Sequence, residues 1–183
     1  GWSRGRYYVP AVRVDADRRQ DIGEFDQREI GRRARALKAR HRGNRLWQHL
    51  LGCALCSGCP AANNLVMGRW EEPLPTSPAC NARCLGCLSL QPAASCCPAT
   101  QERIAFAPTV AEILEVAAPH LATAPRAVAS FGQGCEGEPL LVAPLIEAAV
   151  RAIRARTARG TLNMNTNASV PAALERLLDA GDE

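Results

Sequence analysis

The stretch Cys80-Asn81-Ala82-Arg83-Cys84-Leu85-Gly86-Cys87 places three thiols at a C-x3-C-x2-C spacing. Pro73, Pro75 and Pro78 precede it, and each proline disfavours the helical region for the residue before it, so we predict an extended approach to a loop. Three thiolates are one fewer than the four that close a structural zinc site or an ordinary iron–sulfur cluster. We therefore expect a metal centre with one open coordination position, at which chemistry takes place.

From residue 109 the chain alternates between short apolar strands and amphipathic helices. Thr109 and Glu112 form a capping-box pattern at the start of one helix, which we expect Pro119 to end. The later elements are predicted in this order: strand 126–131, helix 140–159, strand 161–165 and a helix that Ser169 caps, with Gly181 past its end. Repeated strand–helix units favour parallel pairing, an α/β fold in which function gathers where the strands end.

Two loops follow strands in this part of the chain. The first is Glu136-Gly137-Glu138-Pro139, in which Gly and Pro kink the backbone and a carboxylate can accept hydrogen bonds from an ammonium group. The second contains Thr166-Asn167-Ala168, whose amides can bind a cofactor or substrate or serve as ordinary turn and cap residues.

Taken together, these motifs resemble the radical S-adenosylmethionine (radical SAM) enzymes over about residues 72–183. In that family a C-x3-C-x2-C loop, a Gly-Gly-Glu-Pro segment after the second strand and a Thr-Asn-Gly turn after the third occur in this order. Here Glu136 replaces the first Gly of the second motif and Ala168 replaces the Gly of the third. Gly86 stands where the family often has an aromatic residue near the adenine.

The resemblance implies a fold and a reaction. The fold is the first half of a partial (β/α)6 TIM-like barrel with parallel strands. Cys80, Cys84 and Cys87 would bind a [4Fe–4S] cluster whose fourth iron is chelated by S-adenosylmethionine. Reductive cleavage would then give a 5′-deoxyadenosyl radical that abstracts hydrogen from an unknown substrate.

The resemblance also implies roles for the two loops and for a partner. Glu138 would bind the methionyl ammonium, with Gly137 and Pro139 shaping the turn, and Thr166 and Asn167 would lie near the cofactor. The electron would come from a donor such as flavodoxin or ferredoxin.

The chain ahead of this core is predicted to form two segments. Residues 1–52 are a mostly helical basic arm, since residues 1–50 hold 13 Lys and Arg against 6 Asp and Glu. Short strands and a turn are expected within 1–26, and the helical pattern from Gln27 to Leu51 should break at Gly43-Asn44. Such an arm can contact nucleic acid, but a solvated Arg-rich helix has the same pattern.

Residues 53–71 are a Cys-rich segment and a link, with 64–70 predicted as a short buried strand or connection. Cys53, Cys56 and Cys59 form a C-x2-C-x2-C run that can hold an auxiliary cluster or another metal, or can be unligated thiols. Two residues are candidates to complete that group: Cys96 and Cys97. His41 and His49 are further possible ligands, although such histidines more often pack or face solvent.

Two other classes of protein remain open from the residues alone. One is a structural zinc module with Cys53, Cys56, Cys80 and Cys84 as ligands and a nucleic-acid-binding arm. The other is a ferredoxin-like electron carrier with two clusters, which needs eight well-spaced cysteines.

Composition and the number of cysteines indicate the class of protein and its expected location in the cell. The 183 residues are 47% hydrophobic, as expected for a folded domain, and contain nine cysteines. Their close clustering favours metal binding over a disulfide framework, so we expect a cytoplasmic protein. No apolar run approaches the roughly 20 residues of a membrane helix, and membrane association is not expected. The chain starts at Gly1 and stops after an expected helix end, and we interpret it as a fragment.

Overall fold

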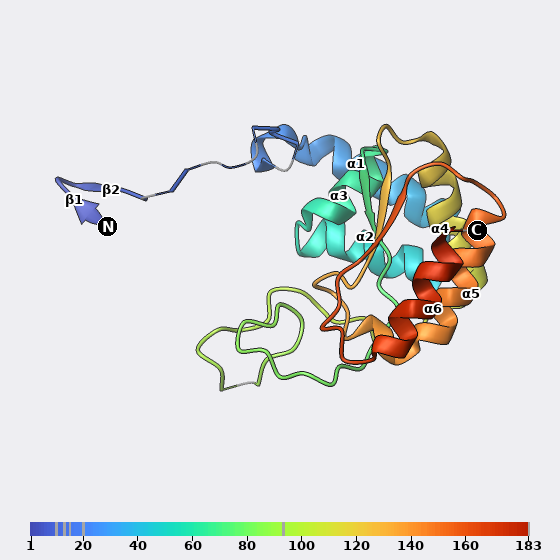
Figure 1. The fold of residues 1–183 in the computed structure, drawn as a ribbon. Coiled ribbons are helices and arrows are strands. Elements are labelled where there is room, and N and C mark those ends of the chain that lie inside the picture. The colour runs from blue at the N-terminus through green and yellow to red at the C-terminus, as the bar shows by residue number, and fades with distance from the viewer. Residues whose placement is uncertain (10, 13, 15, 20, 93, 183) are drawn as a thin grey trace.

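A parallel sheet of three strands lies at the centre of the fold (Figure 1). The strands are β3 (Glu71–Pro73), β4 (Val128–Phe131) and β5 (Thr161–Met164), with β4 in the middle. The computed structural model describes residues 1–9, 11–12, 14, 16–19, 21–92 and 94–182. The predicted α/β class with parallel strands is confirmed.

Three helices flank the sheet, and two of them connect its strands. They are α4 (Val110–Thr123) before β4, α5 (Ala143–Arg154) before β5, and α6 (Pro171–Asp182) after β5. A short 3-10 helix, η2 (Pro139–Val142), leads into α5. Neighbouring helices of this set pack on each other, α4 on α5 and α5 on α6, and Figure 1 shows them along one flank of the sheet. Each parallel pair is thus joined by a helical crossover.

The N-terminal half contributes three more helices, α1 (Gln27–Arg40), α2 (Arg45–Cys56) and α3 (Pro60–Met67). The expected break at Gly43-Asn44 is present, because the Asn44 side chain accepts a hydrogen bond from the Trp47 N–H at 3.0 Å and starts α2. The predicted strand or link at 64–70 is wrong for 64–67, which are helical. Pro60 in the first turn and left-handed Gly68 at the C-cap define α3 instead.

Helix α4 shows where local sequence rules hold and where they fail. The capping box between Thr109 and Glu112 is confirmed, with both reciprocal hydrogen bonds formed. The helix does not end at Pro119 as expected but continues to Thr123. Proline removes only one N–H, and the final turn is held by the buried side chain of Leu121 and by an N–H bond from Ala124 to the His120 carbonyl.

The first residues form a small hairpin of β1 (Trp2–Ser3) and β2 (Arg6–Tyr7), which projects away from the rest of the chain in Figure 1. A 3-10 helix, η1 (Ile22–Glu24), follows before α1. The charges of α1 are partly paired within the helix, since Glu29 contacts both Arg32 and Arg33. Short strands are thus present within residues 1–26, but Tyr8, Val9, Val12 and Val14, which suggested them, lie outside β1 and β2.

One continuous hydrophobic cluster joins the N-terminal helices to the sheet and its flanking helices. It includes Ile30 of α1, Leu50 of α2, Ile113 of α4 and Ile146 of α5, all essentially inaccessible to solvent. Helix α2 also runs through position 52/53, where the sequence analysis placed a segment boundary. The helices ahead of the sheet thus share a core with it.

Strand β5 forms one edge of the sheet. Among the described residues it is hydrogen-bonded to β4 on one side and to no strand on the other. A cavity of about 490 Å³ lies beside it, lined by apolar side chains that include Met164, Leu174 and Leu177.

No single helix among the described residues has the length and apolar composition of a membrane span. The pair α2 and α3 meets those two criteria only jointly and is bent by 114° at the break between them.

Glu72 is a buried carboxyl group on β3. It shares a sheet face with its register partners Ala129 and Leu162, and its Oε2 lies 3.9 Å from Nδ1 of His120 on α4. Neither of its oxygens has a hydrogen-bond partner in the part of the chain that the structure describes. Burial raises the pKa of Glu72 well above its ordinary value, and burial lowers the pKa of His120. Both groups are therefore held in their neutral forms.

Glu72→Gln should remove a pH-dependent loss of stability. Above pH 4.5 the unfolded chain releases the Glu72 proton while the folded chain keeps it, so wild-type stability falls as pH rises, by up to about 1.4 kcal/mol per pH unit. The glutamine side chain of the variant does not titrate, so the variant lacks this contribution to the pH dependence. Urea unfolding between pH 4.5 and 7 should therefore show a shallower decline for the variant than for the wild type.

Exposed Glu175→Gln on α6 is the matched control and should follow the wild-type curve. Parallel pH curves for wild type and Glu72→Gln would contradict a neutral Glu72.

Candidate functional site

The carboxyl ends of the three parallel strands lie at the same end of the sheet. One of the predicted motifs follows each strand there. The Cys80–Cys87 loop comes after β3, Glu136–Pro139 comes after β4, and Thr166-Asn167 comes after β5. Parallel strands place their carboxyl ends together. Hydrogen bonds join these three loops to one another.

The Glu136 carboxylate braces the first two strand ends. Its Oε2 accepts hydrogen bonds from the N–H groups of Thr76 at 2.8 Å and Ser77 at 3.0 Å and from the Thr76 hydroxyl. Its Oε1 accepts from the N–H groups of Gly132 and Gln133. Burial raises the pKa of Glu136, although these donors oppose the shift. Sequence reasoning treated this residue only as a departure from glycine and missed its role.

Gly137 allows the chain that follows β4 to approach the chain that follows β3 closely. Its N–H donates to the Ser77 carbonyl at 2.7 Å, and the next N–H, of Glu138, donates to the Ala79 carbonyl at 2.8 Å. A Cβ at position 137 would lie 1.8 Å from the Ala79 carbonyl oxygen. Only glycine fits, which explains this position of the motif.

Glu138 connects the β4 loop to the β5 loop. Its Oε1 accepts from the Leu140 N–H at 3.1 Å and from the Thr166 hydroxyl, and its Oε2 accepts from the Asn167 N–H at 2.9 Å. A carboxylate has about four acceptor positions, and three are used here. Among the described residues, Oε2 therefore has one acceptor position without a donor. Pro139 follows in the first turn of η2.

Asn81 connects the cysteine loop to the β5 loop. Its Nδ2 donates to the Ser169 hydroxyl and its Oδ1 accepts from Asn167 Nδ2, both at 2.8 Å. Asn167 Oδ1 in turn accepts from the Ser169 N–H at 3.0 Å. Asn167 thus contacts the cysteine loop through Nδ2 and its own loop through Oδ1.

The three cysteines of the loop differ in exposure. Cys84 is exposed, while Cys80 and Cys87 are partly buried. The loop backbone is held by Gln91, whose Nε2 donates to the carbonyls of Leu85 at 2.9 Å and Cys87 at 3.0 Å. The central thiol therefore faces solvent on a loop that is fixed near its end.

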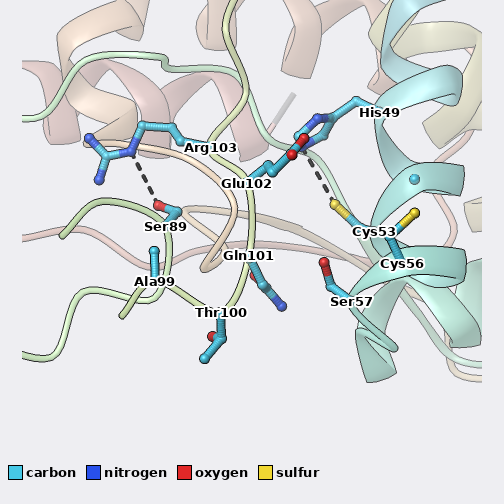
Figure 2. Close-up of a pocket in the computed structure, with 11 residues that line it drawn as sticks. His49, Cys53, Cys56, Ser57, Ser89, Ala99, Thr100, Gln101, Glu102 and Arg103 are labelled. Atoms are coloured by element: carbon cyan, nitrogen blue, oxygen red, sulfur yellow. Dashed lines mark hydrogen bonds between the residues drawn. The ribbon is translucent and has the colours of Figure 1, made fainter. Parts of the chain in front are cut away.

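Cys87 lies in a surrounding that favours the thiolate. Arg103 Nη2 is 3.3 Å from its sulfur, and Arg103 Nε also donates to the Ser89 hydroxyl, as Figure 2 shows. Burial raises the pKa of Cys87, but hydrogen bonds from Ser89 and Leu90 and the charge of Arg103 outweigh it, so the pKa is lowered. The thiolate is the form that binds metals.

The spacing of these thiols bears on what they can hold. Among the described residues, Cys80, Cys84 and Cys87 are not a group whose sulfurs all lie within 4.8 Å, and neither are the four cysteines of the alternative zinc module. In an iron–sulfur cluster each thiolate binds a different iron, so the sulfurs stand well apart. Cys80, Cys84 and Cys87 are thus three separated thiols on one loop, and the pKa of Cys87 is lowered.

A second group of ligand atoms lies elsewhere. His49 and Cys53 on α2 and Cys135 after β4 have ligand atoms within 4.8 Å of one another, with Cys53 Sγ 3.6 Å from His49 Nε2. A hydrogen bond with Cys135 lowers the pKa of Cys53 to about 5, against the effect of burial and with help from His49. The same bond and burial raise the pKa of Cys135.

Sequence spacing did not identify this second group. It paired Cys53 with Cys56 and Cys59, whereas Cys135 is distant in sequence and was assigned no role. Cys56 is exposed on α2, and Cys59 is the N-cap residue of α3. The predicted set Cys53, Cys56 and Cys59 is not among the close ligand groups of the described residues.

A cavity of about 650 Å³ lies between α2 and residues 99–103 (Figure 2). His49, Cys53 and Cys56 line one side, and Ser89 and Arg103 line the other. The cavity therefore separates the second ligand group from the surroundings of the cysteine loop.

Cys96 and Cys97 are exposed, with their sulfurs 3.8 Å apart. Neither belongs to the close ligand group of the described residues.

Comparison with protein-family models, with curated proteins and with solved structures gives no match for this chain.

Glu136→Gln should destabilise the fold by about 1–3 kcal/mol, because an amide nitrogen would replace one of two oxygens that face only hydrogen-bond donors. Urea unfolding at neutral pH measures the change. Exposed Glu175→Gln makes the same chemical change at a carboxylate that has no donor among the described residues and should be close to neutral. Equal effects of the two substitutions would contradict the bracing role.

Proposed function

We propose that this chain is part of a radical SAM enzyme. The observation that carries the proposal is the joining of three loops at the carboxyl edge of a parallel sheet, through Gly137 to residues 77–79, Glu138 to Thr166 and Asn167, and Asn81 to Asn167. The loops hold the three motifs of the resemblance in the same order. Their contacts join three loops from separate parts of the chain.

The same order supports a proposal for the complete fold. Three parallel strands in sequential order, each followed by a helix of the flank α4–α6, correspond to the first three units of a (β/α)6 barrel. The cysteine loop follows the first of these strands. In a barrel the carboxyl ends of the strands form the mouth that holds the active site.

Cys80, Cys84 and Cys87 are proposed to hold a [4Fe–4S] cluster. When bound, the cluster would supply the electron for reductive cleavage of S-adenosylmethionine to methionine and a 5′-deoxyadenosyl radical, which abstracts hydrogen from a substrate. Arg103 stabilises the Cys87 thiolate. Gln91 fixes the loop by its bonds to two loop carbonyls.

Glu138 is proposed to bind the methionyl ammonium of S-adenosylmethionine through the free acceptor position on Oε2. Thr166 and the Asn167 N–H orient this carboxylate by donating to its two oxygens. Their proposed role in cofactor binding is therefore to position the Glu138 carboxylate. Gly137 and Pro139 set the direction of the turn that carries it.

An electron donor such as flavodoxin or ferredoxin is the proposed partner, and the cytoplasm is the proposed location. All nine cysteines are free, which is the state that a thiolate-ligated cluster needs.

Cys84→Ala should abolish the cluster signal. After anaerobic reconstitution and reduction, we expect a [4Fe–4S]⁺ electron paramagnetic resonance signal that shifts when S-adenosylmethionine is added, together with its reductive cleavage to 5′-deoxyadenosine. Cys84 is exposed, so its loss should not disturb the fold. Cys96→Ala, also exposed, is the matched control and should keep the signal. A wild-type protein without iron, or a signal that persists in Cys84→Ala, would contradict the proposal.

Glu138→Gln should weaken binding of S-adenosylmethionine by about 10- to 100-fold, since a hydrogen bond to a charged group contributes about 1.5–3 kcal/mol. Titration of the spectroscopic shift measures the affinity. Thr166→Val removes a donor to Glu138 but keeps the carboxylate, so its loss should be smaller. Equal losses in the two variants would show that Glu138 acts only as a link between loops.

A further inference from the structure

We propose that His49, Cys53, Cys59 and Cys135 bind one zinc ion, at a site separate from the Cys80–Cys87 loop. This inference does not depend on the proposed radical chemistry. It rests on the ligand atoms of three side chains that the fold brings together, His49 and Cys53 of α2 and Cys135 after β4. Two of them, Cys53 and Cys135, are buried.

The distances agree with a single metal ion. The ligand atoms of His49, Cys53 and Cys135 all lie within 4.8 Å of one another. A nitrogen and a sulfur bound to zinc at about 2.1 and 2.3 Å at a tetrahedral angle stand roughly 3.6 Å apart. The separation between His49 Nε2 and Cys53 Sγ is 3.6 Å. The pair is therefore already spaced as two zinc ligands.

The donor types select the metal. Thiolates with one imidazole form the Cys3His set that structural zinc sites use. An iron–sulfur cluster would need sulfurs spread around several irons, which three ligand atoms this close together do not provide. Magnesium and calcium prefer oxygen ligands, so a soft divalent ion is favoured.

Cys59 is assigned as the fourth ligand because of its place at the start of α3. Its N–H donates to the Cys53 carbonyl at 3.1 Å, so its backbone lies directly against the first cysteine. Its thiol is partly buried. Among the described residues its sulfur is not within 4.8 Å of all three other ligand atoms, so its side chain would turn toward the ion when zinc binds. Cys56 lies one turn along α2 from Cys53 but is exposed and lines the cavity in Figure 2.

The site would connect two parts of the fold. Three ligands come from α2 and the start of α3, and the fourth, Cys135, directly precedes Glu136. The Cys135 carbonyl also accepts the Ile104 N–H at 2.8 Å, which anchors the loop from a second side. Zinc there would fix the N-terminal helices to the loop that carries Glu136 and Glu138.

The test uses metal analysis of the protein purified without oxygen, followed by exchange of zinc for Co²⁺. We expect one zinc per chain, and after exchange the strong thiolate-to-cobalt charge-transfer absorption and intense visible bands of a tetrahedral site. Cys53→Ser and Cys135→Ser should lose the metal and these bands. Cys56→Ser is the matched control and should retain both, and Cys59→Ser should retain cobalt with weaker charge-transfer absorption.

Cys84→Ala separates this site from the proposed cluster, because it should lose iron and keep zinc. If the buried-cysteine variants fail to fold, cobalt exchange in the wild-type protein still decides, since its bands report thiolate ligation directly. Wild-type protein that takes up neither zinc nor tetrahedral cobalt would overturn the proposal. So would a Cys56→Ser variant that loses the metal as fully as Cys135→Ser, because the ligands would then be the sequential cysteines.

Discussion

The arrangement of the site depends on the carboxylate of Glu136. It accepts hydrogen bonds from N–H groups at 76–77, after β3, and at 132–133, after β4. Buried N–H groups without an acceptor are costly, and the β3–β4 ladder ends before these residues. One side chain thus replaces the ladder where the strands separate. The loops that carry Gly137, Glu138 and Cys80 all start from this junction.

Two buried carboxyl groups, only a few residues from the strand ends, behave in opposite ways. Glu72 has no hydrogen-bond partner among the described residues and is held neutral by burial within the core beside His120. Glu138 is also buried, but it accepts hydrogen bonds from three donors on three different residues and, among the described residues, has one acceptor position without a donor. The surroundings, not the residue type, decide that one carboxyl group packs as a neutral side chain while the other can receive a ligand.

Features set by neighbours in sequence were predictable. The capping box at Thr109, the helix break at Asn44 and the alternation of strands with helices follow from local patterns, and each is present. Features set by distant contacts were not. Helix α4 continues past Pro119 because its last turn is packed, and Cys135 approaches His49 and Cys53 only through the fold. The bracing of two strand ends by Glu136 likewise has no local signal.

The edge of β5 has a consequence for how these 183 residues behave in solution. Its outer backbone groups have no strand partner among the described residues, and an apolar hollow lies beside them. Such an edge accepts an added strand, whether from the same chain or from another molecule. Pairing of two molecules along β5 would satisfy these backbone groups, so this edge offers a route to self-association.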